Sequence, residues 1–116
     1  MRTAILIIIF IFMATVALAG PRLSGTQSVA AGGTPERLNA TSVFCGTIVV
    51  SADGNNTNVV VIGDSSVDAT EATRTGTALF PGQTEYLTSS SGRLNVNDTW
   101  VDVVTNDEGV SWNCLN

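Results

Sequence analysis

The sequence predicts an all-β fold, a small antiparallel β-sandwich or jelly-roll-like domain preceded by one apolar N-terminal helix. Short runs rich in Val, Ile and Thr are separated by clusters of Gly, Asn, Asp and Pro, which is typical of antiparallel strands and their turns. The chain has 116 residues, enough for one domain. Residues Ala4–Ala19 are apolar and uncharged, so they predict a transmembrane or signal helix.

We therefore divide the chain into three parts. Residues 1–20 are the apolar transmembrane or signal helix, residues 21–37 a flexible linker, and residues 38–116 the β-sandwich domain. The linker is assigned because this stretch is rich in Gly, Ser, Thr and Ala and has neither a helical nor a strand period.

The apolar segment fits two functions. Arg2, the apolar run and the small-residue pattern Ala17-Leu18-Ala19 match a signal peptide cleaved before Gly20. A retained membrane anchor is the alternative, because a helix of this length spans about 24 Å and modest bilayer thinning would accommodate it. The side chains that an anchor would place in lipid are Ile5, Leu6, Ile7, Ile8, Ile9, Phe10, Ile11, Phe12, Met13, Val16 and Leu18.

From Ala40 onward the pattern is that of strands. Ala40–Ala52 and Asn58–Ile62 are expected to form a β-hairpin around the turn residues 53–56. The long polar stretch from Val67 to Gly76 is expected to be a loop. Three further short strands are predicted at Thr77–Phe80, Glu85–Thr88 and Leu94–Val96.

The last hairpin has the clearest pattern. Thr99–Thr105 and Val110–Leu115 are expected to pair around the turn residues 106–109. Asp102 alternates with apolar neighbours and is expected to be solvated. The side chains expected to face the core are Val101, Val103, Val110, Trp112 and Cys114.

Composition excludes several classes of function. The net charge is −5, with neither Lys nor His, so the chain lacks a basic surface for nucleic acid and a His proton shuttle. An acidic chain is also not attracted electrostatically to anionic lipid headgroups. The serines have no base to activate them, so we expect no enzyme activity and no cofactor. Asp53, Asn55 and Thr57 faintly resemble the start of a calcium loop, but its closing Gly and Glu are lacking, and no metal is expected.

Two cysteines, Cys45 and Cys114, lie near the two ends of the predicted domain. In an exported domain such a pair favours a disulfide, which would close a loop of about 70 residues. In a reducing cytosol the alternative is two buried free thiols.

Several segments carry a resemblance to a known class of proteins. They are Glu36–Ser42, Val59–Ala69 with its Gly-Asp-Ser-Ser-Val-Asp-Ala stretch, Leu79–Gly82 and Trp100–Ser111. Over Glu36–Leu115 the chain resembles the small β-sandwich modules of bacteriophage structural proteins, such as head-decoration, fibre and spike-like components. The resemblance implies a virion surface part with no catalytic residues.

The apolar N-terminus departs from that class. A phage with an internal membrane would use it as an anchor, so we expect a virion structural protein that ties the viral bilayer to the capsid or projects at its surface. Its expected partners are capsid or other virion proteins, the bilayer and further copies of itself, and not nucleic acid. The alternatives are a secreted or cell-surface binding module released after Ala19, and a pilin-like filament subunit.

Overall fold

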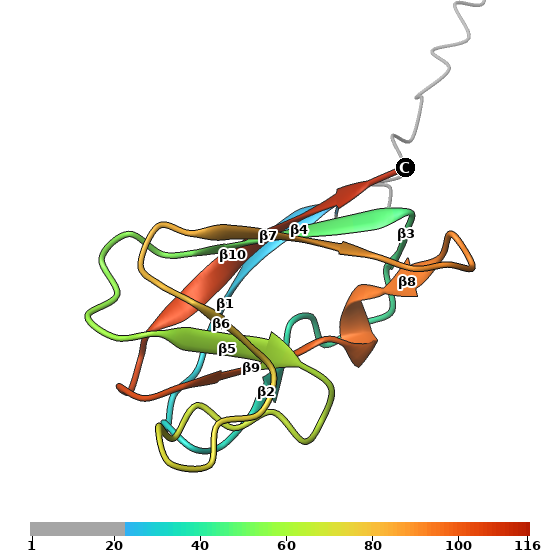
Figure 1. Ribbon diagram of the computed structural model, residues 1–116. Helices are drawn as coiled ribbons and strands as arrows, with labels where there is room; N and C mark the ends of the chain where they lie inside the picture. Colours follow the sequence, from blue (N-terminus) through green and yellow to red (C-terminus); the bar gives the residue numbers. More distant parts are fainter. Residues whose placement is uncertain (1–22) are drawn as a thin grey trace, which may run out of the picture.

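The computed structural model describes residues 23–116, which form two four-stranded antiparallel β-sheets packed face to face (Figure 1). Sheet A has the strand order β1 (Ser24–Ser28), β10 (Gly109–Leu115), β4 (Thr47–Ala52), β7 (Thr84–Thr88). Sheet B has the order β2 (Glu36–Arg37), β9 (Trp100–Val103), β5 (Val60–Gly63), β6 (Thr77–Leu79). A third pair, β3 (Phe44–Cys45) with β8 (Leu94–Asn95), and the 3-10 helix η1 (Val96–Asp98) lie at one end.

The all-β prediction is confirmed for this part of the chain. The predicted helix over residues 1–20, with the anchor side chains from Ile5 to Leu18, lies outside the described residues. From residue 23 onward, no helix has the length and apolarity needed to cross a bilayer.

The chain alternates between the two sheets, and both predicted hairpins are wrong. The strand β4 belongs to sheet A and β5 to sheet B, and β9 and β10 are likewise divided between the sheets. Among the hydrogen-bonded strand pairs of residues 23–116, only β5 and β6 are consecutive in the chain. Turn residues reverse the chain equally well within a sheet and between two sheets, so the local pattern does not distinguish the two connections.

The prediction of a flexible linker over residues 21–37 is wrong from Ser24 onward. Strand β1 pairs with β10 along its whole length, and Gly25 lies opposite Trp112. A Cβ at Gly25 would come within 2.9–3.0 Å of the Trp112 indole, so the strand approaches the ring closely only because this residue has no side chain. The following Val29 and Leu38 are fully buried. These polar and glycine residues are held by their pairing partner, and not by an apolar pattern of their own.

The core lies between the two sheets. The five predicted core side chains Val101, Val103, Val110, Trp112 and Cys114 are all buried, as expected. A second, smaller cluster lies on the opposite face of sheet B, where Val61, Val67 and Ala69 pack with Ala78 and Trp100. The long loop between β5 and β6 supplies Val67 and Ala69, and it therefore covers the outer face of sheet B.

The glycine that opens β10 provides a test of how tightly β1 is held. A Cβ at Gly109 would collide with the backbone oxygen of Gln27 and lie 2.8 Å from the Ser28 Cα. Because both contacts are backbone atoms of β1, Gly109→Ala is expected to lower the free energy of unfolding by about 2 kcal/mol through overpacking. Chemical denaturation measures this loss. The control Gly54→Ala, where a Cβ meets nothing within 4 Å, should unfold like the wild type; equal stability of both variants would contradict the packing of β1.

Candidate functional site

Cys45 and Cys114 form a disulfide, one of the two arrangements considered from the sequence. Their Cα atoms are 5.4 Å apart and the sequence separation is 69 residues. The bond links β3 to the last strand of the chain, and both cysteines are buried. It therefore fixes the end of the sandwich at which residue 23 lies, because the Cys114 amide donates to the Leu23 carbonyl at 2.7 Å.

Asp102 is fully buried, so the prediction that it is solvated is wrong. Its carboxylate accepts the backbone N–H of Gly33 at 3.0 Å and that of Ala69 at 2.8 Å. These two donors belong to the β1–β2 connection and to the long loop, both of which lie over the outer face of sheet B. One carboxylate thus ties two loops to β9, and its role is structural.

Glu108 is a second buried acid with a structural role. It accepts hydrogen bonds from the Thr57 amide, from the Thr57 hydroxyl at 2.7 Å and from the Asn58 amide at 3.3 Å. The neighbouring Asn56 amide group pairs with the backbone of Gly109 through both its nitrogen and its oxygen. The residues that faintly resembled a calcium loop therefore form a turn closed by side chains.

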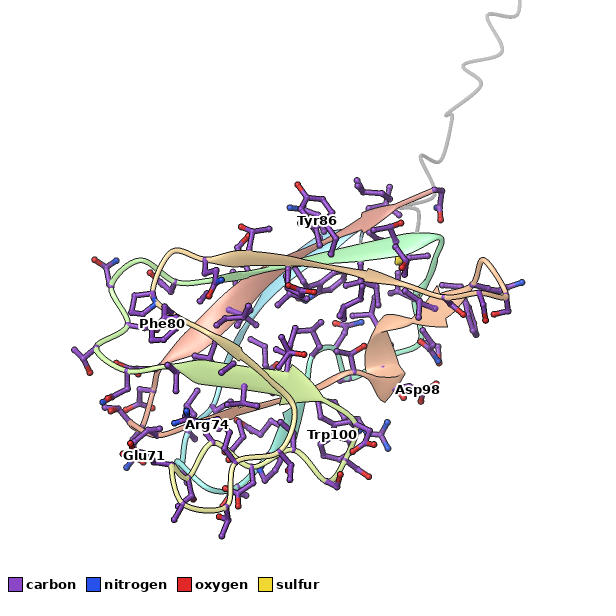
Figure 2. All side chains as sticks on the ribbon, in the orientation of Figure 1. Glu71, Arg74, Phe80, Tyr86, Asp98 and Trp100 are labelled. Carbon is purple, nitrogen blue, oxygen red and sulfur yellow. A yellow bond between two sulfur atoms is a disulfide. The ribbon has the colours of Figure 1, made fainter. Side chains whose placement is uncertain are left out.

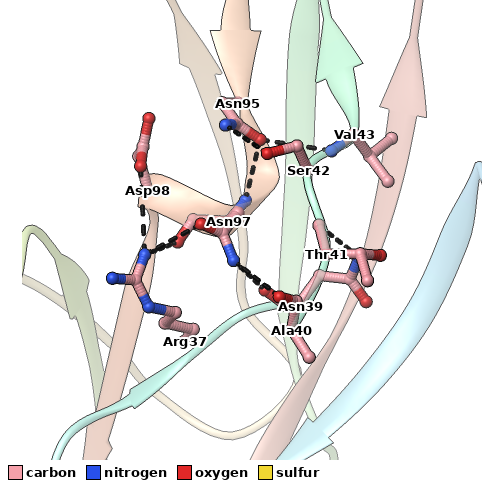
Figure 3. A network of polar contacts seen from close by, with 9 residues as sticks. All are labelled: Arg37, Asn39, Ala40, Thr41, Ser42, Val43, Asn95, Asn97 and Asp98. Atoms are coloured by element: carbon pink, nitrogen blue, oxygen red, sulfur yellow. Dashed lines mark hydrogen bonds and ion pairs between the residues drawn. The ribbon is translucent and has the colours of Figure 1, made fainter.

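A network of asparagine side chains holds residues 39–43 against η1 (Figure 3). The Asn97 side-chain amide donates to the carbonyls of Asn39 and Ala40, each at 2.9 Å. The Asn95 side-chain oxygen accepts from the amides of Val43 and Asn97. Arg37 donates to Asn97 and also lies over the Trp100 ring, 4.6 Å from its centroid. These polar groups hydrogen-bond to one another and to the neighbouring backbone, and in this way they fix the conformation of this end of the fold.

Two acids of the long loop, Asp64 and Asp68, are hydrogen-bonded locally. Hydrogen bonds from the Ser66 hydroxyl and amide lower the pKa of Asp64, and bonds from Thr73 and Thr70 lower the pKa of Asp68. Both carboxylates are anionic at neutral pH and stabilise their turns in that form. In the part of the chain that the structure describes, no three His, Cys, Asp or Glu side chains lie close enough to bind a metal ion.

Removal of one of these hydroxyls has a defined consequence. Ser66→Ala is expected to raise the pKa of Asp64 toward its ordinary value of 3.8, because the strongest bond to the carboxylate is lost. In the wild type, the lowered folded-state pKa of Asp64 stabilises the fold above about pH 4, and this stabilisation is lost as the pH falls through the folded-state pKa. In the variant, the stabilisation above that pH is smaller. Carboxyl-carbon NMR titration measures the change. The pKa of Asp68 is the internal control and should not move.

A hollow of about 560 Å³ lies at the end of sheet A farthest from the disulfide. Asp53, Asp107 and Gly109 contribute to its lining, together with hydroxyls of β1 and β10. The hollow contains no aromatic side chain and no paired nucleophile and base. Its lining is thus polar and acidic.

The outer face of sheet A is the most unusual surface of the molecule. Its outward positions carry no charged residue, although the chain has a net charge of −5. They are small and mostly polar, and Tyr86 stands out at 63% exposure (Figure 2). The outward side chains are Ser24, Thr26, Ser28, Ser111, Asn113, Leu115, Thr47, Val49, Ser51, Thr84, Tyr86 and Thr88. We call these twelve residues the uncharged face.

Comparison of the chain with protein-family models, with curated proteins and with solved structures finds no match. The sequence pattern had identified the cysteine pair, but it did not identify Asp102, Glu108 or the asparagine network. Their only sequence signal is an acid or amide within or beside a predicted strand, and solvated positions carry the same residue types.

Proposed function

We propose that the protein is a virion structural component of a membrane-containing phage, anchored by residues 4–19 and packed by its β-sandwich against a capsid protein or further copies of itself. The order of strands supports a jelly-roll fold, since the first, third, sixth and last of the eight sandwich strands share one sheet and the others share the second. Jelly rolls include viral capsid domains, and this part of the proposal is an analogy at the level of fold.

The uncharged face is the observation that carries the proposal. Charged residues are depleted at the centres of protein–protein interfaces, and a sheet face of hydroxyls, Val49 and Tyr86 meets a partner without the cost of burying charge. The cross-strand pair of Ser51 and Thr84, 2.7 Å apart, satisfies two of these hydroxyls within the sheet. The surface therefore suits close packing against another protein surface more than it suits binding of a small charged ligand.

The disulfide supports a location outside the reducing cytosol, which this proposal requires. Such bonds persist in secreted proteins, in the periplasm and at virion surfaces, and are rare in the cytosol. The buried Cys45–Cys114 bond thus agrees with a domain that folds outside the reducing cytosol.

Particle incorporation tests this proposal. Particles from the producing culture are purified on a density gradient, and the chain is identified by intact mass. We expect it in the particle fraction, with residues 4–19 present, and released only by detergent. Ser111→Asp, at the centre of the uncharged face, should reduce incorporation, whereas Ala72→Asp on the exposed long loop should not. A chain that begins at Gly20 and stays in the medium would contradict the proposal.

The second candidate is a secreted or surface binding module. It is favoured by the Ala17-Leu18-Ala19 pattern, which fits a signal-peptidase site. The disulfide agrees with it equally well. The intact mass separates the two functions, because only the secreted module begins at Gly20.

A further inference from the structure

The N-terminal segment joins the domain at one end of the sandwich. Leu23 pairs with Cys114, and the β3–β8 pair and the end of β10 lie at the same end (Figure 1). We call this the tether end and define it by the exposed side chains Leu23, Phe44, Arg93 and Leu115.

The connection to the apolar segment is short. Because β1 begins at Ser24 and the apolar run ends at Ala19, only residues 20–22 separate that run from Leu23. Three extended residues reach about 10 Å at most. Where residues 4–19 are embedded in a bilayer, the tether end is therefore held within reach of the lipid headgroups.

The tether end has the side chains that such a position requires. Leu23 is 54% exposed, and Phe44 and Leu115 are each 49% exposed. The Arg93 guanidinium lies over the Phe44 ring, 4.3 Å from its centroid, beside a small hollow of about 260 Å³ that also borders the C-terminal Asn116. Apolar side chains with an arginine above an aromatic ring are suited to the boundary between acyl chains and headgroups.

The charges of the domain are distributed in agreement with this orientation. Residues 40–46, 88–94 and 113–116, which build the tether end, contain Arg93 and no acidic side chain. The opposite end carries Asp53 and Asp107, and the long loop carries Asp64, Asp68 and Glu71. Asp98 of η1 lies at the same end of the fold as β3 and β8, but the other acidic side chains named here lie away from the side that the anchor faces, which reduces repulsion by anionic headgroups.

We propose that the tether end rests on the lipid surface, with Leu23, Phe44 and Leu115 inserted at the interface and Arg93 among the headgroups, so that the sandwich stands on the membrane in one orientation. This inference depends on the anchored form of the proposed function. It adds a second membrane contact, made by the folded domain itself.

Tryptophan substitutions at the two ends test the orientation. The full-length chain is reconstituted into phosphatidylcholine–phosphatidylglycerol vesicles whose acyl chains are brominated near the headgroups. Phe44→Trp reports on the tether end, and the matched variant Phe80→Trp reports on the opposite end, where Phe80 is 66% exposed (Figure 2). Leu115→Trp is a second reporter at the tether end. Trp100 and Trp112 are common to all variants, so the wild-type chain gives the baseline.

We expect the tryptophan added in Phe44→Trp and in Leu115→Trp to lose most of its emission in brominated vesicles and to emit at shorter wavelength. The tryptophan added in Phe80→Trp should keep the emission intensity and wavelength that it has in water. Equal emission from both ends, whether quenched or unquenched, would overturn the inference. If the chain floats with the vesicles in that case, the anchor stands and only the orientation fails. If it does not float, the anchored function fails as well.

Discussion

Reduction of the Cys45–Cys114 disulfide is expected to lower the free energy of unfolding by about 4 kcal/mol. The bond closes a loop whose ends are 69 residues apart, and the loss of chain entropy in the unfolded state grows with the logarithm of that length. Since domains of this kind are stable by only about 5–15 kcal/mol, the reduced protein should be marginal at 37 °C. Urea denaturation with and without a thiol reductant measures the difference.

The double variant Cys45→Ala/Cys114→Ala is the control for the reductant. It should unfold near the midpoint of the reduced wild type and show no response to reductant. If oxidised and reduced wild-type protein unfold at the same urea concentration, the bond does not stabilise the domain in the manner described.

Asp102→Ala is expected to lower the free energy of unfolding by about 3 kcal/mol. The carboxylate is fully buried and accepts the amides of Gly33 and Ala69. Its removal leaves the buried Ala69 N–H without a partner, and it leaves the Gly33 N–H with only its 3.2 Å bond to the Val103 carbonyl. Asp102→Asn keeps one acceptor oxygen and should lose about 2 kcal/mol. Thermal or chemical denaturation provides the values.

Asp98→Asn is the matched control for this residue. Asp98 is the last residue of η1, is 75% exposed and makes only a 3.9 Å ion pair with Arg37. Its neutralisation should change the stability by less than about 0.5 kcal/mol. Equal losses at Asp98 and Asp102 would show that the buried carboxylate does not hold the two loops.

Most of the strands could be predicted from the sequence, but not their pairing. The predicted runs matched β5, β6, β7, β8, β9 and β10 to within a few residues, and the single run Ala40–Ala52 covered both β3 and β4. This is because an alternating apolar pattern marks a half-buried strand whatever its partner. Pairing depends on contacts between residues distant in the chain. Strand β1 escaped prediction because its inward positions are Gly25 and Gln27, and its place is determined by the Trp112 ring on a strand nearly ninety residues away.

The candidate surfaces were predictable to a smaller extent. The cysteine pair was visible because its chemistry is specific and its spacing is long. The uncharged face was not, because it is formed by alternate residues of four strands and exists only in the correct register. Asp102 was misassigned because the outer face of sheet B is covered by a loop whose buried residues, Val67 and Ala69, are isolated among polar neighbours.

The position of β10 has a consequence for how the chain is made. Among the strands of residues 23–116 this one is synthesised last, yet it lies in the interior of sheet A, between β1 and β4. Neither β1 nor β4 can form its hydrogen bonds to β10 until residues 109–115 have been synthesised. The Cys45–Cys114 disulfide cannot form earlier either. Pairings of such long range also form slowly. Sheet A therefore stays in two parts, β1 on one side and the β4–β7 pair on the other, until the residues of β10 are available to join them.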